Sequence, residues 1–304
     1  MPASTLEVSV PDDHAGQVAR HERFEFGRNW RHFLRVIDEP RIRRAEQALV
    51  SMLRQPSLAN LSFLDIGCGS GLSSLAARRL GARVHSFDFD PDSAWCTEEL
   101  RRRYFPGDAG WTVERGSVLD DSYMRSLGTF DIVYSWGVLH HTGHMWDAVA
   151  AASNAVAPDG KLFLALYNDL GSRSRRWRAI KHTYNALPRA LRPWFVALAI
   201  APQEFKNFVR PLVKGRPFEY LRSWTRYDER GMSRWRDAVD WVGGYPYEVA
   251  TPEQVFDFCT ARGFALTALK CGGVGLGCNE FVFDRKPIAS EIRPSREKSF
   301  RGGA

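Results

Sequence analysis

The segment with the clearest chemical pattern is FLDIGCGSGLSS, residues 63–74. An apolar run leads into it and helically spaced apolar residues follow, so the sequence predicts a strand, a tight turn and a helix. Three glycines occupy the turn: Gly67, Gly69 and Gly71. A loop that holds the phosphates of a dinucleotide follows the pattern G-x-G-x-x-G, and Leu72 stands where its third glycine belongs. The turn is therefore not predicted to bind a pyrophosphate.

An acidic residue, Asp65, lies two positions before the first glycine of this turn. A carboxylate there would repel a pyrophosphate, whereas it would attract an ammonium group. The ligand of the loop is therefore expected to carry a positive charge close to Asp65. The N–H groups at the start of the following helix suit a carboxylate on the same ligand.

The strands and helices that must position this loop alternate along the chain. Strands are predicted for seven segments: 61–66, 83–90, 111–115, 131–135, 161–168, 265–270 and 279–285. Regular alternation of strand and helix predicts a parallel sheet that is covered on both faces. Ligands of such a sheet bind beyond the carboxyl ends of the parallel strands, so the residues that follow each strand are candidate site residues.

The order of the predicted strands and helices also predicts the domain organisation of the chain. The predicted core is not continuous in the sequence, because a helical stretch without strand pattern interrupts the alternation of strands and helices. The expected parts are a disordered N-terminus (1–20), an N-terminal helical cap (21–58), a core (59–168 and 247–286), a helical insertion (169–246) and a flexible tail (287–304). The sixth strand is expected to run parallel to the fifth, so that the glycine-rich loop 272–277 opens on the ligand side.

Composition places the chain among cytoplasmic proteins with a substantial core. Of its 304 residues, 44% are hydrophobic, which suffices for one large α/β domain with an elaboration. The five cysteines are scattered and predict reduced thiols rather than a disulfide framework. The N-terminal residues do not resemble a signal peptide, and the longest apolar run, 194–201, is too short to span a bilayer.

The basic charge of the chain is concentrated in the insertion, residues 169–246. This segment holds sixteen Lys and Arg residues against seven Asp and Glu, a surplus of +9, whereas the whole chain carries only +7. One interpretation is a solvated helical face. The other is an anionic partner, such as a phosphorylated substrate, a membrane surface or RNA. The apolar segments WFVALAIA and FKNFV within it suit a lipid or membrane surface, or else packing of its helices against the core.

Four motifs together resemble the class I S-adenosylmethionine-dependent methyltransferases: LDIGCGSG, an acidic strand end at Asp88, GSVLD and FDIVYSWGVLHH. The resemblance covers residues 60–168 and 247–286, and it is nearest to small-molecule methylases related to ubiquinone-biosynthesis O-methyltransferases. It implies an α/β, Rossmann-like, seven-stranded and mostly parallel sheet with helices on both faces. It also implies an antiparallel last strand, with the helical insertion following strand five. The implied cofactor is S-adenosyl-L-methionine, and the implied product is S-adenosyl-L-homocysteine.

The resemblance assigns cofactor contacts to residues at the ends of the first four strands. In S-adenosylmethionine, the ammonium suits Asp65 and the carboxylate suits the glycine loop. The ribose hydroxyls suit Asp88, and the adenine suits Phe89. Asp120 is a further candidate, as an acceptor for the adenine amino group. The implied cofactor-binding residues are Asp65, Gly67, Cys68, Gly69, Gly71, Asp88, Phe89, Ser117, Val118, Leu119 and Trp136. Alternatively, Asp88 caps the helix that begins at Pro91, and Trp136 is a core residue.

The acceptor of the methyl group is expected on the same side of the sheet. An acceptor hydroxyl or amine must lose a proton near the transition state, and a histidine suits that role because its unperturbed pKa is about 6.5. Candidate catalytic residues are His140, His141 and Tyr167, and candidate substrate-binding residues are Asn168, Tyr245, Tyr247, Asn279 and Glu280. Alternatively, one histidine of the pair only orients its loop. Together with His144 the pair also suggests a metal triad, but no carboxylate completes it at useful spacing, so no metal is expected.

These patterns predict a methyltransferase acting on a small molecule, most simply by O-methylation of an anionic, glycan, lipid or secondary-metabolite acceptor. One alternative is an RNA-modifying methyltransferase whose insertion grips phosphates and stacks bases on its tryptophans. Those tryptophans are Trp177, Trp194, Trp224, Trp235 and Trp241. Another alternative is a catalytically silent cofactor-binding protein. Peripheral contact of the insertion with the inner face of the membrane is a further expectation.

Overall fold

The computed structural model describes residues 14–216, 218, 220, 234–273 and 277–286. The expected flexible tail, residues 287–304, lies outside the described residues, as do residues 1–13. The prediction of disorder over residues 1–20 is wrong for residues 14–19, which form helix α1 (His14–Ala19). Its first residue is buried against the core, and this tertiary contact has no counterpart in the local sequence.

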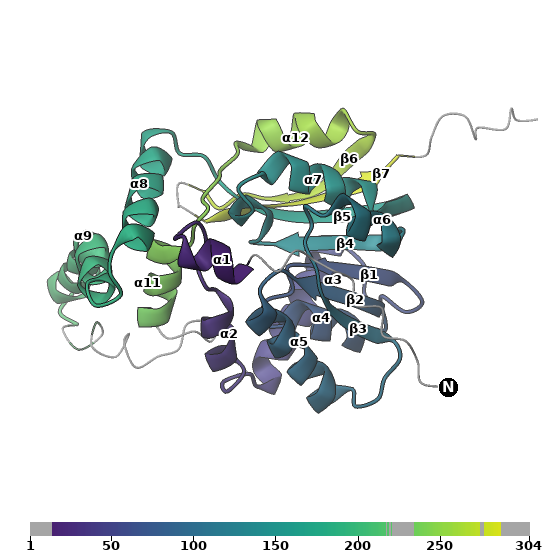
Figure 1. The fold of residues 1–304 in the computed structure, drawn as a ribbon, viewed down its shortest axis with the longest axis horizontal. Helices are drawn as coiled ribbons and strands as arrows, with labels where there is room; N and C mark the ends of the chain where they lie inside the picture. The colour runs from purple at the N-terminus through teal and green to yellow at the C-terminus, as the bar shows by residue number, and fades with distance from the viewer. Residues whose placement is uncertain (1–13, 217, 219, 221–233, 274–276, 287–304) are drawn as a thin grey trace, which may run out of the picture.

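A seven-stranded sheet forms the centre of the molecule, in the order β3-β2-β1-β4-β5-β7-β6 (Figure 1). The strands are β1 (Ser62–Ile66), β2 (Arg83–Asp88), β3 (Trp111–Arg115), β4 (Phe130–Trp136), β5 (Val156–Tyr167), β6 (Phe264–Lys270) and β7 (Cys278–Arg285). The first five strands are parallel, and β7 runs antiparallel to both β5 and β6. The predicted fold class, including the antiparallel last strand, is confirmed. As expected, β6 has the direction of β5, although β7 lies between them.

Helices cover both faces of the sheet, as the alternation of strand and helix requires. One face is covered by α3 (Glu39–Leu53), α4 (Leu72–Arg79) and α5 (Pro91–Tyr104), and the other by α6 (Asp121–Leu127), α7 (Met145–Asn154) and α12 (Pro252–Thr260). Successive strand residues point to opposite faces, so Phe63 packs in the first layer and Leu64 in the second. Both layers are therefore continuous apolar cores.

The insertion forms a separate helical group beside the carboxyl ends of the parallel strands (Figure 1). Its described helices are α8 (Ser172–Ala186), α9 (Arg192–Val213) and α11 (Arg234–Gly243). They share a small apolar core with Phe24, in which Tyr184, Val196 and Val242 are buried. Residues 14–33, which we call the N-terminal strap, comprise α1, a connecting segment and α2 (Gly27–Phe33). The insertion thus packs on the strap as well as on the end of the sheet.

Candidate functional site

The glycine turn between β1 and α4 has a backbone that only glycine adopts readily. Gly67, Gly69 and Gly71 have φ angles of 74°, 55° and 79°. Close neighbours add a second constraint at two of these positions. A Cβ at position 67 would lie 2.3 Å from a methyl of Val138, and one at position 71 would lie 2.8 Å from the Cα of Thr97. The turn is consequently fixed against both the end of β4 and helix α5.

Asp88 at the end of β2 closes this turn. Its carboxylate accepts hydrogen bonds from the N–H of Gly69 at 2.9 Å and from the N–H of Asp90 at 2.9 Å. Helix α5 is capped by Asp90, whose side chain accepts from the N–H of Asp92. The alternative prediction that Asp88 caps this helix is therefore wrong. Burial, assisted by the charge of Asp90, raises the pKa of Asp88 to about 7. The side chain is thus a half-buried acceptor held beside the turn.

Asp65 lies beneath the same turn and is 2% exposed. Its carboxylate accepts a hydrogen bond from the hydroxyl of Ser74 on α4. Burial raises the pKa of Asp65 to about 7. In the described part of the chain, neither Asp65 nor Asp88 lies within ion-pair distance of a basic side chain. Both carboxylates therefore retain the capacity to bind a cationic or hydroxyl-bearing ligand.

A cavity of about 2400 Å³ extends from the glycine turn to the insertion. Its lining includes every predicted cofactor-binding residue except Gly71, which lies at the start of α4 behind it. The lining members are Asp65, Gly67, Cys68, Gly69, Asp88, Phe89, Ser117, Val118, Leu119 and Trp136, together with Asp120. Asp120 also caps α6, since it accepts from the N–H groups of Ser122 and Tyr123. Residues from four strand ends thus meet at one cavity.

The candidate acceptor-side residues divide into two groups. His141, Tyr167 and Glu280 line the same cavity. Outside its lining lie His140, Asn168, Tyr245, Tyr247 and Asn279. Asn279 is buried, donates to the side-chain oxygen of Asn168 at 3.1 Å and accepts from the N–H of Gly272 at 3.0 Å. These two asparagines therefore join the β6–β7 connection to the end of β5.

The two adjacent histidines lie in a short 3-10 turn, η1 (Leu139–His141), and have different environments. His140 is fully buried, its Nδ1 accepts from the N–H of Tyr167 at 3.3 Å, and the two rings lie 3.8 Å apart. The Nδ1 of His141 lies 2.6 Å from the carbonyl oxygen of Pro246. A carbonyl only accepts, so this Nδ1 carries the proton and Nε2 keeps its lone pair. Of the pair, only His141 can offer a basic nitrogen to the cavity.

Burial lowers the pKa of both histidines, so both are neutral at physiological pH. The pKa of His140 lies well below its usual value, and that of His141 is lowered to about 3 by burial and by the nearby charge of Lys181. His144, the third histidine of the segment, is exposed and pairs with Asp147 at 3.6 Å. Within residues 14–216, 234–273 and 277–286, no three His, Cys, Asp or Glu side chains are arranged to hold a metal ion.

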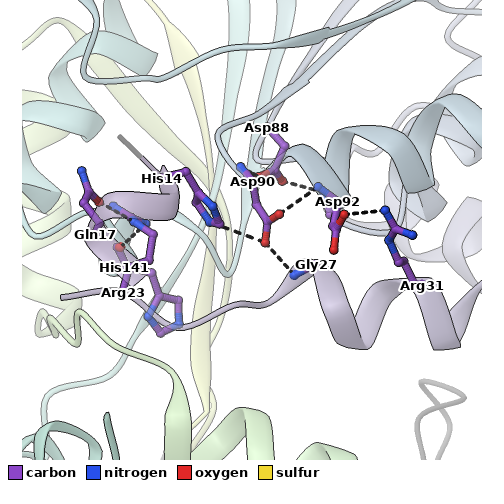
Figure 2. Close-up of polar contacts among 10 residues, drawn as sticks. His14, Gln17, Arg23, Gly27, Arg31, Asp88, Asp90, Asp92 and His141 are labelled. Carbon is purple, nitrogen blue, oxygen red and sulfur yellow. Dashed lines mark hydrogen bonds and ion pairs between the residues drawn. The ribbon is translucent and has the colours of Figure 1, made fainter. Parts of the chain in front are cut away.

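Several residues that sequence reasoning missed belong to the N-terminal strap (Figure 2). The ring of His14 lies 5.4 Å from the ring of Phe89, and its Nε2 lies 3.7 Å from a carboxylate oxygen of Asp90. The guanidinium carbon of Arg23 lies 5.0 Å from the centre of the Phe89 ring. The strap thus covers the end of β2 where the adenine contact was predicted. No spacing in the segment HERFEF signals this contact, because the partners lie more than sixty residues away.

The insertion contributes an aromatic wall to the cavity. Trp177 and Trp241 both line it, and their rings lie 5.3 Å apart. Behind them Lys181 is fully buried, with its Nζ 4.4 Å from the Trp241 ring centre and 4.9 Å from that of Tyr247. The Lys181 ammonium also donates to the backbone oxygen of Trp241. Burial lowers the pKa of Lys181 to about 7.

The tryptophans predicted to stack bases do not form one exposed surface. Trp177 and Trp241 pack against each other in the cavity wall. Trp194 is 76% exposed on α9, and Trp235 is 37% exposed on α11. Trp224 lies outside the described residues. Base stacking by a row of these side chains is therefore not supported by their arrangement.

Comparisons with known proteins point to one family. Residues 20–201 match the family model described as a methyltransferase domain. Ubiquinone biosynthesis O-methyltransferase of Burkholderia orbicola (strain MC0-3) is 30% identical over 156 residues, which is 50% of this chain and 64% of that protein. The protein of the same name from Methylobacterium sp. (strain 4-46) is 32% identical over 157 residues, 50% of this chain and 59% of that protein. The chain therefore matches less than two thirds of the length of either relative.

Solved structures agree at the level of the fold. An O-methyltransferase family protein from Burkholderia thailandensis superposes with a TM-score of 0.50 at 10% sequence identity. The superposition covers 82% of this chain and 57% of that one. The likeness is one of architecture, in agreement with the strand order described above.

Proposed function

Since the chain belongs to the methyltransferase domain family, as a class I S-adenosylmethionine-dependent methyltransferase, we propose that it methylates a small-molecule acceptor in the cavity. One observation carries the proposal: a single cavity joins Asp88 and the glycine turn to His141 and Tyr167. Cofactor and acceptor can therefore occupy one continuous space. When bound, S-adenosylmethionine supplies an electrophilic methyl group on its sulfonium.

The residues of the cavity fit this cofactor. Asp65 and Asp88 are carboxylates of raised pKa, and each gains a favourable partner when an ammonium or a pair of hydroxyls reaches it. The N-terminus of α4 begins at the glycine turn and suits the carboxylate of the amino-acid portion. Phe89 lies beside the cavity for contact with an aromatic base. In this proposal these residues bind and orient the cofactor, and orientation supplies much of the acceleration.

We propose O-methylation, with His141 as the group that receives the acceptor proton. Its Nε2 is unprotonated because Nδ1 donates to Pro246, and the low pKa keeps the ring neutral at physiological pH. A nitrogen of such low basicity does not ionise a hydroxyl in advance. It would take the proton as the methyl carbon leaves the cofactor sulfur and bonds to the acceptor oxygen, and this timing suits an acidic hydroxyl such as a phenol, whose pKa is about 10. The relatives named as O-methyltransferases support this choice of atom.

The size and lining of the cavity suggest a large acceptor with an aromatic or apolar body. Small-molecule sites usually occupy about 300–1,000 Å³, whereas this cavity measures about 2400 Å³. Aromatic and aliphatic side chains from the insertion line its outer part: Trp177, Ile180, Leu198, Ile200 and Trp241. Basic side chains of the insertion, among them Arg176 and Lys206, stand at the same wall and suit an anionic substituent.

Two measurements test the proposed function. Calorimetry with S-adenosylhomocysteine should detect binding to the purified protein. Mass spectrometry of cell extracts, incubated with and without the protein and S-adenosylmethionine, should then reveal a compound that gains one methyl group. A protein that binds S-adenosylhomocysteine but transfers no methyl group to any extract would instead be the silent cofactor-binding protein. If transfer occurs only to RNA, with steep dependence on salt, the acceptor class is wrong.

We further propose that α9 contacts an anionic membrane surface. Two side chains of this helix that do not line the cavity are strongly exposed for their type: Trp194 at 76% and Phe205 at 68%. Their spacing places them on one stripe of the helix, and Lys206 and Arg210 are exposed nearby. No helix among the described residues is long and apolar enough to cross a bilayer. An apolar stripe beside basic side chains instead suits a helix that lies in the membrane interface.

The membrane proposal is tested by co-sedimentation with vesicles of phosphatidylglycerol and phosphatidylcholine. Wild type should bind the anionic vesicles, and the double variant Trp194→Asp, Phe205→Asp should lose most of that binding. Phe256→Asp is the matched control, because Phe256 is 43% exposed on α12 of the core. Equal binding by wild type and the α9 variant would refute the membrane contact.

A further inference from the structure

Arg23 lies between the predicted cofactor-binding residues and His141 (Figure 2). Its Nη1 donates to the carbonyl oxygen of His141 at 3.0 Å, and its Nε donates to the side-chain oxygen of Gln17 at 2.8 Å. Its guanidinium carbon lies 5.0 Å from the ring centre of Phe89, the residue that follows Asp88. One side chain therefore contacts both the end of β2 and the turn that carries His141.

The backbone on either side of Arg23 is fixed to the core. The N–H of Phe24 donates to the backbone oxygen of Tyr245 at 2.9 Å, and the N–H of Gly27 donates to a carboxylate oxygen of Asp90 at 2.7 Å. A Cβ at position 27 would lie 2.5 Å from the Cβ of Asp92, so the backbone approaches α5 more closely than a larger residue permits. These backbone contacts therefore fix the place from which the Arg23 side chain extends.

Charge joins Arg23 to the cofactor site. Burial lowers the pKa of Arg23, while the carboxylates of Asp88 and Asp90 oppose that shift by stabilising the charged guanidinium. Asp90 also lies 3.7 Å from His14. Asp88 has a raised pKa, so its charge is incomplete near neutral pH. Asp88 lies beyond ion-pair distance of Arg23, so the direct contact of Arg23 with the cofactor site is with the ring of Phe89.

From this geometry we infer that Arg23 is a positioning residue that couples occupancy of the cofactor site to the position of His141. The inference rests on the proposed function. The guanidinium lies over the ring of Phe89, where the adenine contact was predicted, and also donates to the carbonyl oxygen of His141, so a base that packs on Phe89 and the turn that carries His141 share this one side chain. Coupling between two sites is reciprocal, so fixing His141 also strengthens cofactor binding.

The test uses protein with ¹⁵N-labelled histidine and S-adenosylhomocysteine as the probe. The His141 imidazole resonances are assigned by their loss in His141→Asn. In wild type, S-adenosylhomocysteine should shift these resonances. In Arg23→Gln the shift should disappear, and affinity should fall about tenfold through loss of one charge-assisted contact. Arg31→Gln is the matched control, because Arg31 pairs with Asp92 at 2.6 Å on the same strap but outside the cavity lining.

One further variant and two outcomes complete the test. Arg23→Lys keeps the charge but cannot bridge Gln17 and His141 together, so it should bind the probe with a reduced His141 response. This variant carries the test if Arg23→Gln does not fold. A wild-type protein that binds the probe, with an unchanged His141 response in both Arg23 variants, refutes the coupling alone. A wild-type protein that does not bind the probe refutes the proposed function and the coupling with it.

Discussion

The Nδ1 atom of His141 lies 2.6 Å from the backbone oxygen of Pro246, where the insertion rejoins the core. This hydrogen bond selects the tautomer of His141, because the carbonyl can only accept. It also ties the imidazole to the segment that ends the insertion, so the arrangement of the insertion and the orientation of the ring are linked. The Nδ1 of His140 instead accepts from the backbone N–H of Tyr167, and its ring packs on Tyr167 in the interior.

His141→Asn should lower turnover about 100-fold while cofactor affinity is retained, because the proton acceptor is lost but the cofactor contacts and the backbone carbonyl that Arg23 holds are kept. The measurement uses methyl-labelled S-adenosylmethionine with an extract that contains the acceptor, together with calorimetry. His140→Asn is the control: it should lower the thermal midpoint through loss of a buried ring, with turnover reduced far less. Near-normal turnover of His141→Asn would show that orientation alone suffices.

Asp88→Ala should weaken binding of S-adenosylmethionine roughly 100-fold, since two hydrogen bonds to a charged acceptor are worth on the order of 3 kcal/mol. Part of that loss arises because the Gly69 N–H also loses its acceptor. Asp88→Asn separates the two effects, because its amide oxygen still accepts from Gly69 but carries no charge. Calorimetry should rank the affinities as wild type, then Asn, then Ala. Equal affinities would place the ribose contact elsewhere.

Affinity for S-adenosylhomocysteine should depend on pH around 7. Asp65 and Asp88 have pKa values raised to about 7, and the ligand is expected to bind their ionised forms. Affinity should therefore fall as pH falls through 7, by at most about tenfold per pH unit for each carboxylate. Asp88→Asn should show a shallower dependence than wild type. Calorimetric titrations between about pH 5.5 and 8.5 measure this dependence, because the range extends to both sides of these pKa values. An equal change of affinity with pH in wild type and Asp88→Asn would contradict the role of Asp88.

Lys181→Met should change the pH dependence of stability in a defined direction. The pKa of Lys181 is lowered to about 7 in the folded protein, so above pH 7 the unfolded chain binds more protons and wild-type stability rises with pH. The methionine variant lacks this contribution. Its stability relative to wild type should fall by up to about 1.4 kcal/mol per pH unit between pH 7 and the normal lysine pKa of about 10.4.

Denaturant unfolding at several pH values measures this difference. Lys206→Met is the control on the same insertion, because Lys206 is exposed on α9. Its stability relative to wild type should not change with pH over this range. Parallel curves for Lys181→Met and wild type would mean that the Lys181 ammonium is not desolvated by the fold.

The sequence alone determined the sheet elements and the glycine turn. The conformation of the turn is encoded locally, because Gly67 and Gly69 have positive φ angles that other residues adopt only at a cost. The closely spaced glycines therefore predict the turn without any long-range contact. Strand and helix periodicities likewise depend on residues two to four positions apart. The antiparallel return of β7 followed from the family resemblance, and strand pairing with β5 confirmed it.

Only the tertiary structure decided which histidine faces the cavity and what covers Phe89. Adjacent residues have the same local sequence, so His140 and His141 differ only through their packing partners, Tyr167 for one and Pro246 for the other. The bond from Arg23 to His141 joins residues 118 positions apart. Contacts over such separations arise when whole elements pack, because burial of apolar surface, and not local spacing, brings the strap and the insertion to the ends of the strands.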